Sequence, residues 1–328
     1  MDVPSYELPE EAIAQVPAGP RDSARLLVAL GPEPAHLRVR DLPSLLGDGD
    51  VLVVNDSRVV PARLRLHKAT GGAAEVLLLE PVPERPGSWE ALVRPGRRLP
   101  PGTVLYAGDL AVVEVGEEIG DGSREVKSLV DDLGAFGSLA LPPYVHTQLA
   151  EPGRYQTVYA DRPGSVAAPT AGLHLTHAVL EECVRRGATV ERLELAVGLG
   201  TFRPIKGGQV DGHLMHSERY SVPERTWDAC KRAKRVVAVG TTTVRALESA
   251  AATGALEGRT ELYIRPGHDF SVVDVLMTNF HQPRSTLLVL LEAFAGPQWR
   301  GLYETALEEG YRFLSFGDAM VVDRHVPR

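Results

Sequence analysis

The sequence predicts an α/β domain that is interrupted by a small all-β domain. Three observations support this: strand-like and helical segments alternate over the second half of the chain, one short apolar strand precedes residue 56, and the stretch between residues 63 and 155 shows strand-like segments without a helical period. Strands that alternate with helices are typical of a mainly parallel sheet covered by helices. The 328 residues are enough for about two such domains.

The first strand of the α/β domain is predicted at residues 51–54, where the run VLVV is apolar and rich in β-branched residues. It is followed directly by the polar residues NDSR. The chain then enters the all-β region, whose strand-like segments are AEVLLLE, WEALVRPG, TVLYAG, LAVVEV and REVKSLV, separated by glycine and proline. We therefore expect residues 63–155 to form an inserted domain, and residues 1–62 and 156–328 to form the α/β domain.

After residue 176 the pattern becomes helical, with Gly187 placed to end the first helix. Strands are predicted at residues 189–197, 235–240 and 260–264. Helices are predicted at residues 178–186, 223–234, 241–254, 285–296 and 298–310. This alternation predicts βα units and a mainly parallel sheet.

Composition excludes several classes of protein. The 44% hydrophobic and 24% charged residues are typical of a folded globular protein, and no apolar run reaches the roughly 18 residues of a membrane span. The net charge of -8 excludes a histone-like nucleic-acid binder but not an enzyme that docks one RNA through a few arginines. The two cysteines lack the spacing of a disulfide framework or zinc site. We expect no metal, no membrane association and a cytoplasmic location.

Two glycine-rich segments are candidate ligand loops. Residues 164–176, GSVAAPTAGLHLT, place Thr170, Gly172 and His174 among small residues before a helix, where backbone N–H groups can face a ligand. The alternative is a plain connection capped by Thr176. The second segment, VGLGTFRP, contains Gly198 and Gly200 but is not followed by the helix of a dinucleotide fingerprint, so a nicotinamide cofactor is not supported.

Polar residues also gather in four later segments. HLMHSERY contains His216 and Glu218, which suit acid/base chemistry but match no metal signature, and solvated loop histidines are the alternative. In VGTTTVRALES, Thr241, Thr242 and Arg245 follow a predicted strand, where α/β sheets bind ligands, although Arg245 and Glu248 would also suit a surface pair.

The third and fourth segments lie near the end of the chain. TNFHQPRST places Asn279, His281 and Arg284 before a helix that Ser285 can cap. FLSFGDAM places Asp318 in apolar surroundings, which would raise the pKa of its carboxyl unless a cation lies beside it. We expect these segments to form one polar cluster at several strand ends.

Taken in order, the motifs resemble the S-adenosylmethionine:tRNA ribosyltransferase-isomerases of queuosine biosynthesis over nearly the whole chain. The segments that carry the resemblance are ELPEEAIAQ, VLVVNDSRVVPARL, ALVRPGRRL, GSVAAPTAGLHLT, VGLGTFRP, MHSERY, AVGTTTVRALES, TNFHQPRSTLL and EEGYRFLSFGDAM. The resemblance implies an α/β domain with an inserted β-barrel. It also implies that the ribosyl part of S-adenosylmethionine moves to the aminomethyl group of a 7-deazaguanine at the tRNA wobble position, with release of adenine and methionine.

Such a reaction needs a base to remove a proton beside the sulfonium and an acid to protonate the departing adenine. S-adenosylmethionine is expected as a co-substrate, without a bound cofactor. The resemblance gives as catalytic candidates His174, His216, Glu218, Asp274, His281 and Asp318. We expect S-adenosylmethionine to lie between the 170–174 and 240–245 loops, contacted by Thr170, Gly172, Gly198, Gly200, Thr241, Thr242, Arg245 and Asn279. The arginine-rich stretches predict tRNA contacts at Arg58, Arg63, Arg94, Arg97 and Arg98.

The chain departs from the family pattern at several positions. Ala196 stands where members usually have a histidine, and Leu175, Thr243, Gln282 and Arg284 replace a Phe, a Ser, a Leu and a Lys. Two alternatives therefore stay open: a divergent enzyme that uses a small amine or nucleoside as acceptor, and a non-catalytic tRNA-binding protein. Adenine release separates the enzymes from the binding protein, and the acceptor separates the two enzymes.

Overall fold

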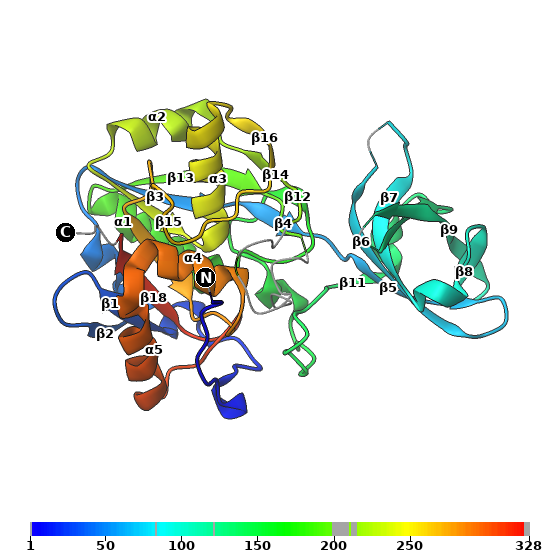
Figure 1. Ribbon diagram of the computed structural model, residues 1–328, viewed down its shortest axis with the longest axis horizontal. Helices are drawn as coiled ribbons and strands as arrows, with labels where there is room; N and C mark the ends of the chain where they lie inside the picture. Colours follow the sequence, from blue (N-terminus) through cyan, green and yellow to red (C-terminus); the bar gives the residue numbers. More distant parts are fainter. Residues whose placement is uncertain (1, 83, 121, 199–209, 211–214, 325–328) are drawn as a thin grey trace. The chain divides into compact units, whose positions relative to one another are not determined.

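The computed structural model describes residues 2–82, 84–120, 122–198, 210 and 215–324. The chain divides into two compact units (Figure 1): an α/β unit of Met1–Arg58, Pro142–Arg162 and Ala168–Arg328, and a β unit of Val59–Leu141 and Pro163–Ala167. The predicted boundaries at residues 62/63 and 155/156 differ from this division, because residues 142–155 group with the α/β unit. Two short strands, β4 (Ser57–Val59) and β12 (Arg162–Ser165), pair where the chain passes between the units.

The inserted unit is a closed antiparallel barrel, as predicted. Its strand order is β5-β6-β7-β10-β9-β8, and an additional β5–β8 pairing closes the ring, while β11 (Gly137–Ser138) adds to β5. Closure leaves no free sheet edge in the ring. The strands of the ring are β5 (Arg63–Lys68), β6 (Ala73–Pro81), β7 (Ser88–Arg94), β8 (Thr103–Ala107), β9 (Leu110–Gly120) and β10 (Ser123–Ser128). Alternate side chains fill its interior, among them Leu64, Leu66, Val76, Leu78, Val113, Val115 and Val126.

The α/β unit is built on a nine-stranded sheet of order β16-β14-β13-β3-β15-β17-β18-β1-β2. The four central strands β13, β3, β15 and β17 are parallel, whereas β18 is antiparallel to β17. The strands are β1 (Arg25–Ala29), β2 (Ala35–Arg38), β3 (Asp50–Asn55), β13 (Thr189–Leu195), β14 (Glu218–Ser221), β15 (Arg235–Val239), β16 (Glu257–Thr260), β17 (Val275–Asn279) and β18 (Ala319–Asp323). The pairing of Asn279 with Ala319 brings the start of β18 beside the end of β17.

The described part of the α/β unit contains five α-helices, close to the predicted positions: α1 (His177–Arg185), α2 (Glu224–Arg232), α3 (Thr241–Thr253), α4 (Thr286–Ala295) and α5 (Trp299–Glu308). Thr176 and Ser285 cap α1 and α4 as predicted, because their hydroxyl oxygens accept hydrogen bonds from the N–H groups of Val179 and Leu288, both at 3.2 Å. Short 3-10 helices join these elements, among them η3 (Val39–Leu45), η4 (Gly96–Arg98), η6 (Pro152–Tyr155) and η7 (Thr170–His174).

The strand predicted at residues 260–264 is wrong except at its first residue. β16 ends at Thr260, whose hydroxyl oxygen accepts a hydrogen bond from the N–H of Leu262 at 3.0 Å. The carbonyl of Leu262 accepts instead from the Arg245 side chain at 3.2 Å. Side-chain hydrogen bonds thus replace ladder bonds, so the extended chain leaves the sheet.

The two faces of the sheet are covered by different helices. One buried cluster joins α1 and η3 to alternate strand residues, among them Leu52, Val54, Val237, Val239, Val275 and Met277. The helices α2 and α3 pack on the other face of β13, β3 and β15. Cys183 lies in the first cluster and acts there as a small apolar residue, as predicted. In the part of the chain that the structure describes, no helix has the length and apolar character to cross a bilayer.

The chain connections that leave the neighbouring strands β3 and β15 run to opposite sides of these two strands in the sheet. β3 leads through the barrel and α1 to β13 on one side. The neighbouring β15 leads through α3 and the edge strand β16 to β17 on the other side. In open α/β sheets, ligands bind in the crevice outside the carboxyl ends of two such strands. The ends of β3 and β15 are therefore where the topology predicts a site.

Candidate active site

Polar residues from three parallel strands meet at the carboxyl edge of the sheet. β3 ends at Asn55, whose side-chain amide donates to the carbonyl of Leu195 at 2.9 Å and to Oγ1 of Thr242 at 3.2 Å. Gly240, which follows β15, donates its N–H to the carbonyl of Met277 in β17 at 2.8 Å. Gly240 has a φ of 87°, a conformation that favours glycine and turns the chain from the strand into α3. The strand ends are thus tied into one surface.

The η7 loop packs on this surface. Thr170 donates its hydroxyl to Oδ1 of Asn279 at 2.8 Å, and a Cβ placed on Gly240 would lie 3.8 Å from the Cβ of Ala171. The loop fits closely because Gly172 has no side chain: a Cβ there would lie 2.1 Å from the Tyr159 hydroxyl. The 170–174 and 240–245 loops therefore lie at the same edge of the sheet.

A small pocket opens beside the end of β17. The side chains of its wall carry no formal charge, and it is lined by Tyr144, Thr170, Asn279, Phe280, His281, Gln282, Ser285, Leu287, Leu314 and Ser315. Two loops far apart in sequence are joined at its rim, where the Tyr144 hydroxyl and Oγ of Ser315 are 2.7 Å apart. Gln15 fixes the Tyr144 segment by donating to the Tyr144 carbonyl at 2.9 Å and accepting from the N–H of His146 at 2.8 Å.

Asn279 organises the wall of this pocket. Its Oδ1 accepts from Thr170, and its Nδ2 donates to the carbonyl of Asp318 at 3.3 Å and lies 3.1 Å from Nε2 of His174. Because a carbonyl can only accept, the Asp318 contact fixes the orientation of the amide. His174 then accepts at Nε2 and carries its proton on Nδ1.

Two of the predicted histidines, His174 and His281, are buried and neutral. Burial lowers the pKa of His174 to about 4 and that of His281 to about 3. His281 donates its backbone N–H to the Tyr303 hydroxyl at 2.7 Å, and its carbonyl accepts from Tyr6 at 2.6 Å. Its ring Nε2 lies 3.0 Å from Oγ1 of Thr278. At neutral pH both rings are therefore uncharged.

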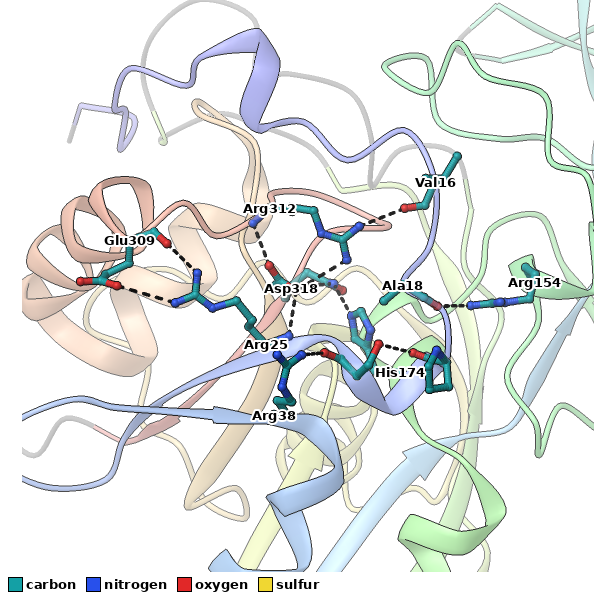
Figure 2. A network of polar contacts seen from close by, with 12 residues as sticks. Val16, Ala18, Arg25, Arg38, Arg154, His174, Glu309, Arg312 and Asp318 are labelled. Carbon is teal, nitrogen blue, oxygen red and sulfur yellow. Dashed lines mark hydrogen bonds and ion pairs between the residues drawn. The ribbon is translucent and has the colours of Figure 1, made fainter.

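Asp318 is buried with the Arg312 guanidinium beside it (Figure 2). Its carboxylate accepts from the backbone N–H groups of Arg25 and Arg312, both at 2.8 Å, and lies 3.6 Å from the Arg312 guanidinium. Both carboxylate oxygens are therefore engaged outside the pocket. Asp318 contacts the His174 and Asn279 cluster through its carbonyl, which makes its carboxylate a link between β1, β18 and the turn before β18.

Glu218 and Arg245 form a second buried cluster. One carboxylate oxygen of Glu218 accepts from Nη1 of Arg245, and the other accepts from the N–H of Gly198 at 3.0 Å. The alternative of a surface pair between Arg245 and Glu248 is wrong. Glu248 is 2% exposed and accepts instead from the backbone N–H groups of Ser271, Val272 and Val273 at 2.8 to 3.1 Å.

Two predicted site residues, Asp274 and His216, lie apart from these clusters. Asp274 precedes β17, five residues and about 16 Å of strand from Asn279, and its carboxylate accepts from the N–H of Val236 at 2.8 Å. His216 is exposed before β14. Gly200 lies outside the described residues. Among the residues that are described, no group of three or more His, Cys, Asp or Glu side chains is arranged to hold a metal ion.

The predicted tRNA-contact arginines are divided between the two units. Arg94, Arg97 and Arg98 are exposed at the end of β7 and on η4 of the barrel, and Arg63 is half-buried in β5. Arg58 is exposed in the α/β unit, where it donates to the carbonyl of Ala160 at 2.8 Å. The barrel therefore presents three neighbouring, exposed guanidinium groups.

Sequence reasoning missed four residues that shape the site: Asn55, Tyr144, Tyr303 and Ser315. The polar run after the strand at residues 51–54 did signal Asn55, but not that its side chain would bridge β13 and α3. No local pattern marks the other three, since each reaches the pocket or His281 from a distant part of the chain.

One family model, two related sequences and one solved structure all match nearly the whole chain and carry related descriptions. A family model described as queuosine biosynthesis protein matches residues 2–322. An S-adenosylmethionine:tRNA ribosyltransferase-isomerase of Rubrobacter xylanophilus is 50% identical over 325 residues, which cover 97% of this chain and 96% of that protein. The protein of the same description from Thermus thermophilus is 52% identical over 342 residues and 97% of both chains. The crystal structure of an S-adenosylmethionine tRNA ribosyltransferase from Thermotoga maritima is similar with a TM-score of 0.55 and 35% identity, over 97% of this chain and 99% of that one.

Proposed function

Because the chain belongs to the queuosine biosynthesis protein family, we propose that it is an S-adenosylmethionine-dependent tRNA ribosyltransferase-isomerase. It moves and isomerises the ribosyl part of S-adenosylmethionine onto 7-aminomethyl-7-deazaguanine at the tRNA wobble position, giving epoxyqueuosine and releasing adenine and methionine. The observation that carries this proposal is identity of 50% or more to proteins of that description over 97% of the chain. A tRNA substrate also favours a cytoplasmic location.

The pocket beside β17 is the proposed site of the chemistry. His281 lines it and is neutral at pH 7, so it can take the proton from the carbon beside the sulfonium. The positive sulfur already acidifies that carbon, which lowers the demand on a weakly basic imidazole. The hydroxyl oxygen of Thr170 and the amide oxygen of Asn279 can accept hydrogen bonds from ribose or adenine, since their hydrogens are already donated within the protein.

His174 is assigned a positioning role. Its Nε2 lone pair already accepts from Asn279, and the ring is absent from the lining of the pocket. A neutral imidazole with a pKa of about 4 is a poor proton donor at pH 7. The proton for departing adenine must therefore come from another group or arrive with the substrate, while His174 holds the amide of Asn279 in one orientation.

The test follows adenine and methionine release from S-adenosylmethionine in three parallel reactions. One contains tRNA that carries 7-aminomethyl-7-deazaguanine, one contains the free deazaguanine base, and one contains no acceptor. The proposal predicts release equal to the modified tRNA consumed, in the first reaction alone. Release with the free base alone would favour a small-molecule enzyme, and tRNA binding without any release would favour a binding protein.

The exposed arginines of the barrel are proposed to contact tRNA phosphates. Each phosphate contact contributes a log-log salt slope of about -0.9 on duplex and about -0.7 on single strands. Reversing the charge of Arg97 and Arg98 should therefore weaken tRNA binding and make its salt slope less steep. Arg85→Glu is the matched control, because Arg85 is an exposed barrel arginine already paired with Glu125 at 2.7 Å. Equal affinities for both variants would make Arg97 and Arg98 ordinary surface.

A further inference from the structure

Two residues beside the pocket have a left-handed backbone without being glycine. Leu314, with a φ of 69°, lines the pocket, and Arg284, with a φ of 58°, lies between the lining residues Gln282 and Ser285. Within the described ranges, Glu84 in the barrel is the one other such residue. Backbone strain of this kind concentrates at functional sites, because folding alone favours glycine there.

The loop around Arg284 is held firmly. Its backbone N–H donates to the carbonyl of Pro4 at 3.0 Å, and Oγ of Ser285 donates to the carbonyl of Gln282 at 2.7 Å. The Arg284 side chain is exposed, and within the part of the chain that is described it has no carboxylate or carbonyl partner. By contrast, the exposed Arg225 and Arg300 pair with Glu191 and Glu292. The fold therefore fixes the Arg284 backbone but makes no use of its charge.

Arg284 belongs to the loop whose residues Gln282 and Ser285 line the pocket, and the named lining residues include no carboxylate. We propose that Arg284 is a phosphate-binding residue that contacts the RNA backbone beside the nucleotide whose base enters the pocket. This rests on the proposed function. An uncharged base suits the neutral pocket, whereas a phosphodiester stays outside and meets the exposed guanidinium, which is always charged and offers several N–H donors. The carboxylate of S-adenosylmethionine shares this chemistry and is the competing ligand.

The test compares Arg284→Gly, Arg284→Lys and the control Arg225→Ala. Glycine removes the charge and also relieves the backbone, so the Arg284→Gly protein should unfold at the same temperature as the wild type or higher. Its affinity for modified tRNA, measured directly by filter binding, should fall about 10-fold or more. The slope of log affinity against log salt concentration should become less steep by about 0.7 to 0.9. Arg284→Lys should keep most of that slope, and Arg225→Ala should match the wild type.

Kinetics separate the outcomes. The proposal predicts that KM for tRNA rises in Arg284→Gly while KM for S-adenosylmethionine and kcat stay unchanged. A rise in KM for S-adenosylmethionine alone would assign Arg284 to the carboxylate and overturn the proposal. Unchanged tRNA affinity with a lower unfolding temperature would make Arg284 a packing residue. Because affinity is measured without turnover, an inactive wild type would contradict the proposed function but leave this test intact.

Discussion

Asn279→Asp changes one donor group of the pocket wall into an acceptor while keeping the shape of the side chain. The wild-type amide donates to His174 and to the Asp318 carbonyl. An aspartate keeps the bond from Thr170 but loses both donated bonds, each worth about 0.5 to 1.5 kcal/mol net. It also buries a charge and leaves the Asp318 carbonyl unsatisfied, so we expect a loss of about 2 to 4 kcal/mol at pH 8.

The effect of pH on this loss can be worked out from His174. In the wild type, the pKa of His174 is about 4 when folded and 6.5 when unfolded, so the unfolded chain takes up the proton first. This contribution to stability is complete above pH 6.5 and is lost as the pH falls toward 4. In Asn279→Asp, the new carboxylate favours protonated His174 in the folded state. The variant therefore does not lose stability through His174 as the pH falls from 6.5 to 4. The difference in the free energy of unfolding between Asn279→Asp and the wild type should therefore shrink as the pH falls.

Urea unfolding at pH 8 and at pH 5 measures this difference. Asn279→Ala is the control, because it loses the two donated bonds, and the bond from Thr170 as well, without adding a charge, and it should differ from wild type by a nearly constant amount. A pH-independent difference for Asn279→Asp, or an aspartate variant as stable as wild type at pH 8, would refute the hydrogen-bond assignment around Asn279.

Three further predictions concern stability. Gly172→Ala should lower the melting temperature, since its Cβ would lie 2.1 Å from the Tyr159 hydroxyl. Adding Tyr159→Phe should recover part of that loss. A double variant no more stable than Gly172→Ala alone would exclude this contact as the cause. Glu218→Gln should cost about 3 to 5 kcal/mol in urea unfolding because Arg245 stays buried without its counter-charge. Glu182→Gln should change little, because Glu182 is partly exposed and its ion pairs with Arg185 and Arg186 lie at the surface. Wild-type stability should fall between pH 6.5 and 4 by up to about 1.4 kcal/mol per pH unit for each of His174 and His281, and His281→Asn should show a shallower fall; equal slopes would contradict burial of a neutral His281.

Local patterns predicted most of the fold because the elements have strong periodicity and clear caps. The helices that follow Thr176 and Ser285 begin as predicted, and the buried strands β3 and β15 were visible as apolar runs. The strand predicted at residues 260–264 failed because Thr260 and Arg245 bind the backbone there, which periodicity cannot reveal.

The site was less predictable because its assembly depends on strand order. Asp318 lies beside Asn279 since β18 pairs with β17, a neighbour that nothing in the local sequence specifies. Asp274 was grouped with the site from its segment, yet it stands at the opposite end of β17. The partners of Arg245 and Glu248 likewise come from β14 and from residues 271–273, far along the chain.

The central claim is that the pocket beside β17 holds the reacting atoms and that His281 acts on them. Single-turnover adenine release by His281→Ala, with S-adenosylmethionine binding measured by calorimetry, tests it most directly, and the exposed His177→Ala is the control. A positioned base contributes about 10² to 10⁴-fold, so the account predicts a loss of about that size with S-adenosylmethionine binding retained and a normal rate for His177→Ala. Near-normal adenine release by His281→Ala would contradict it.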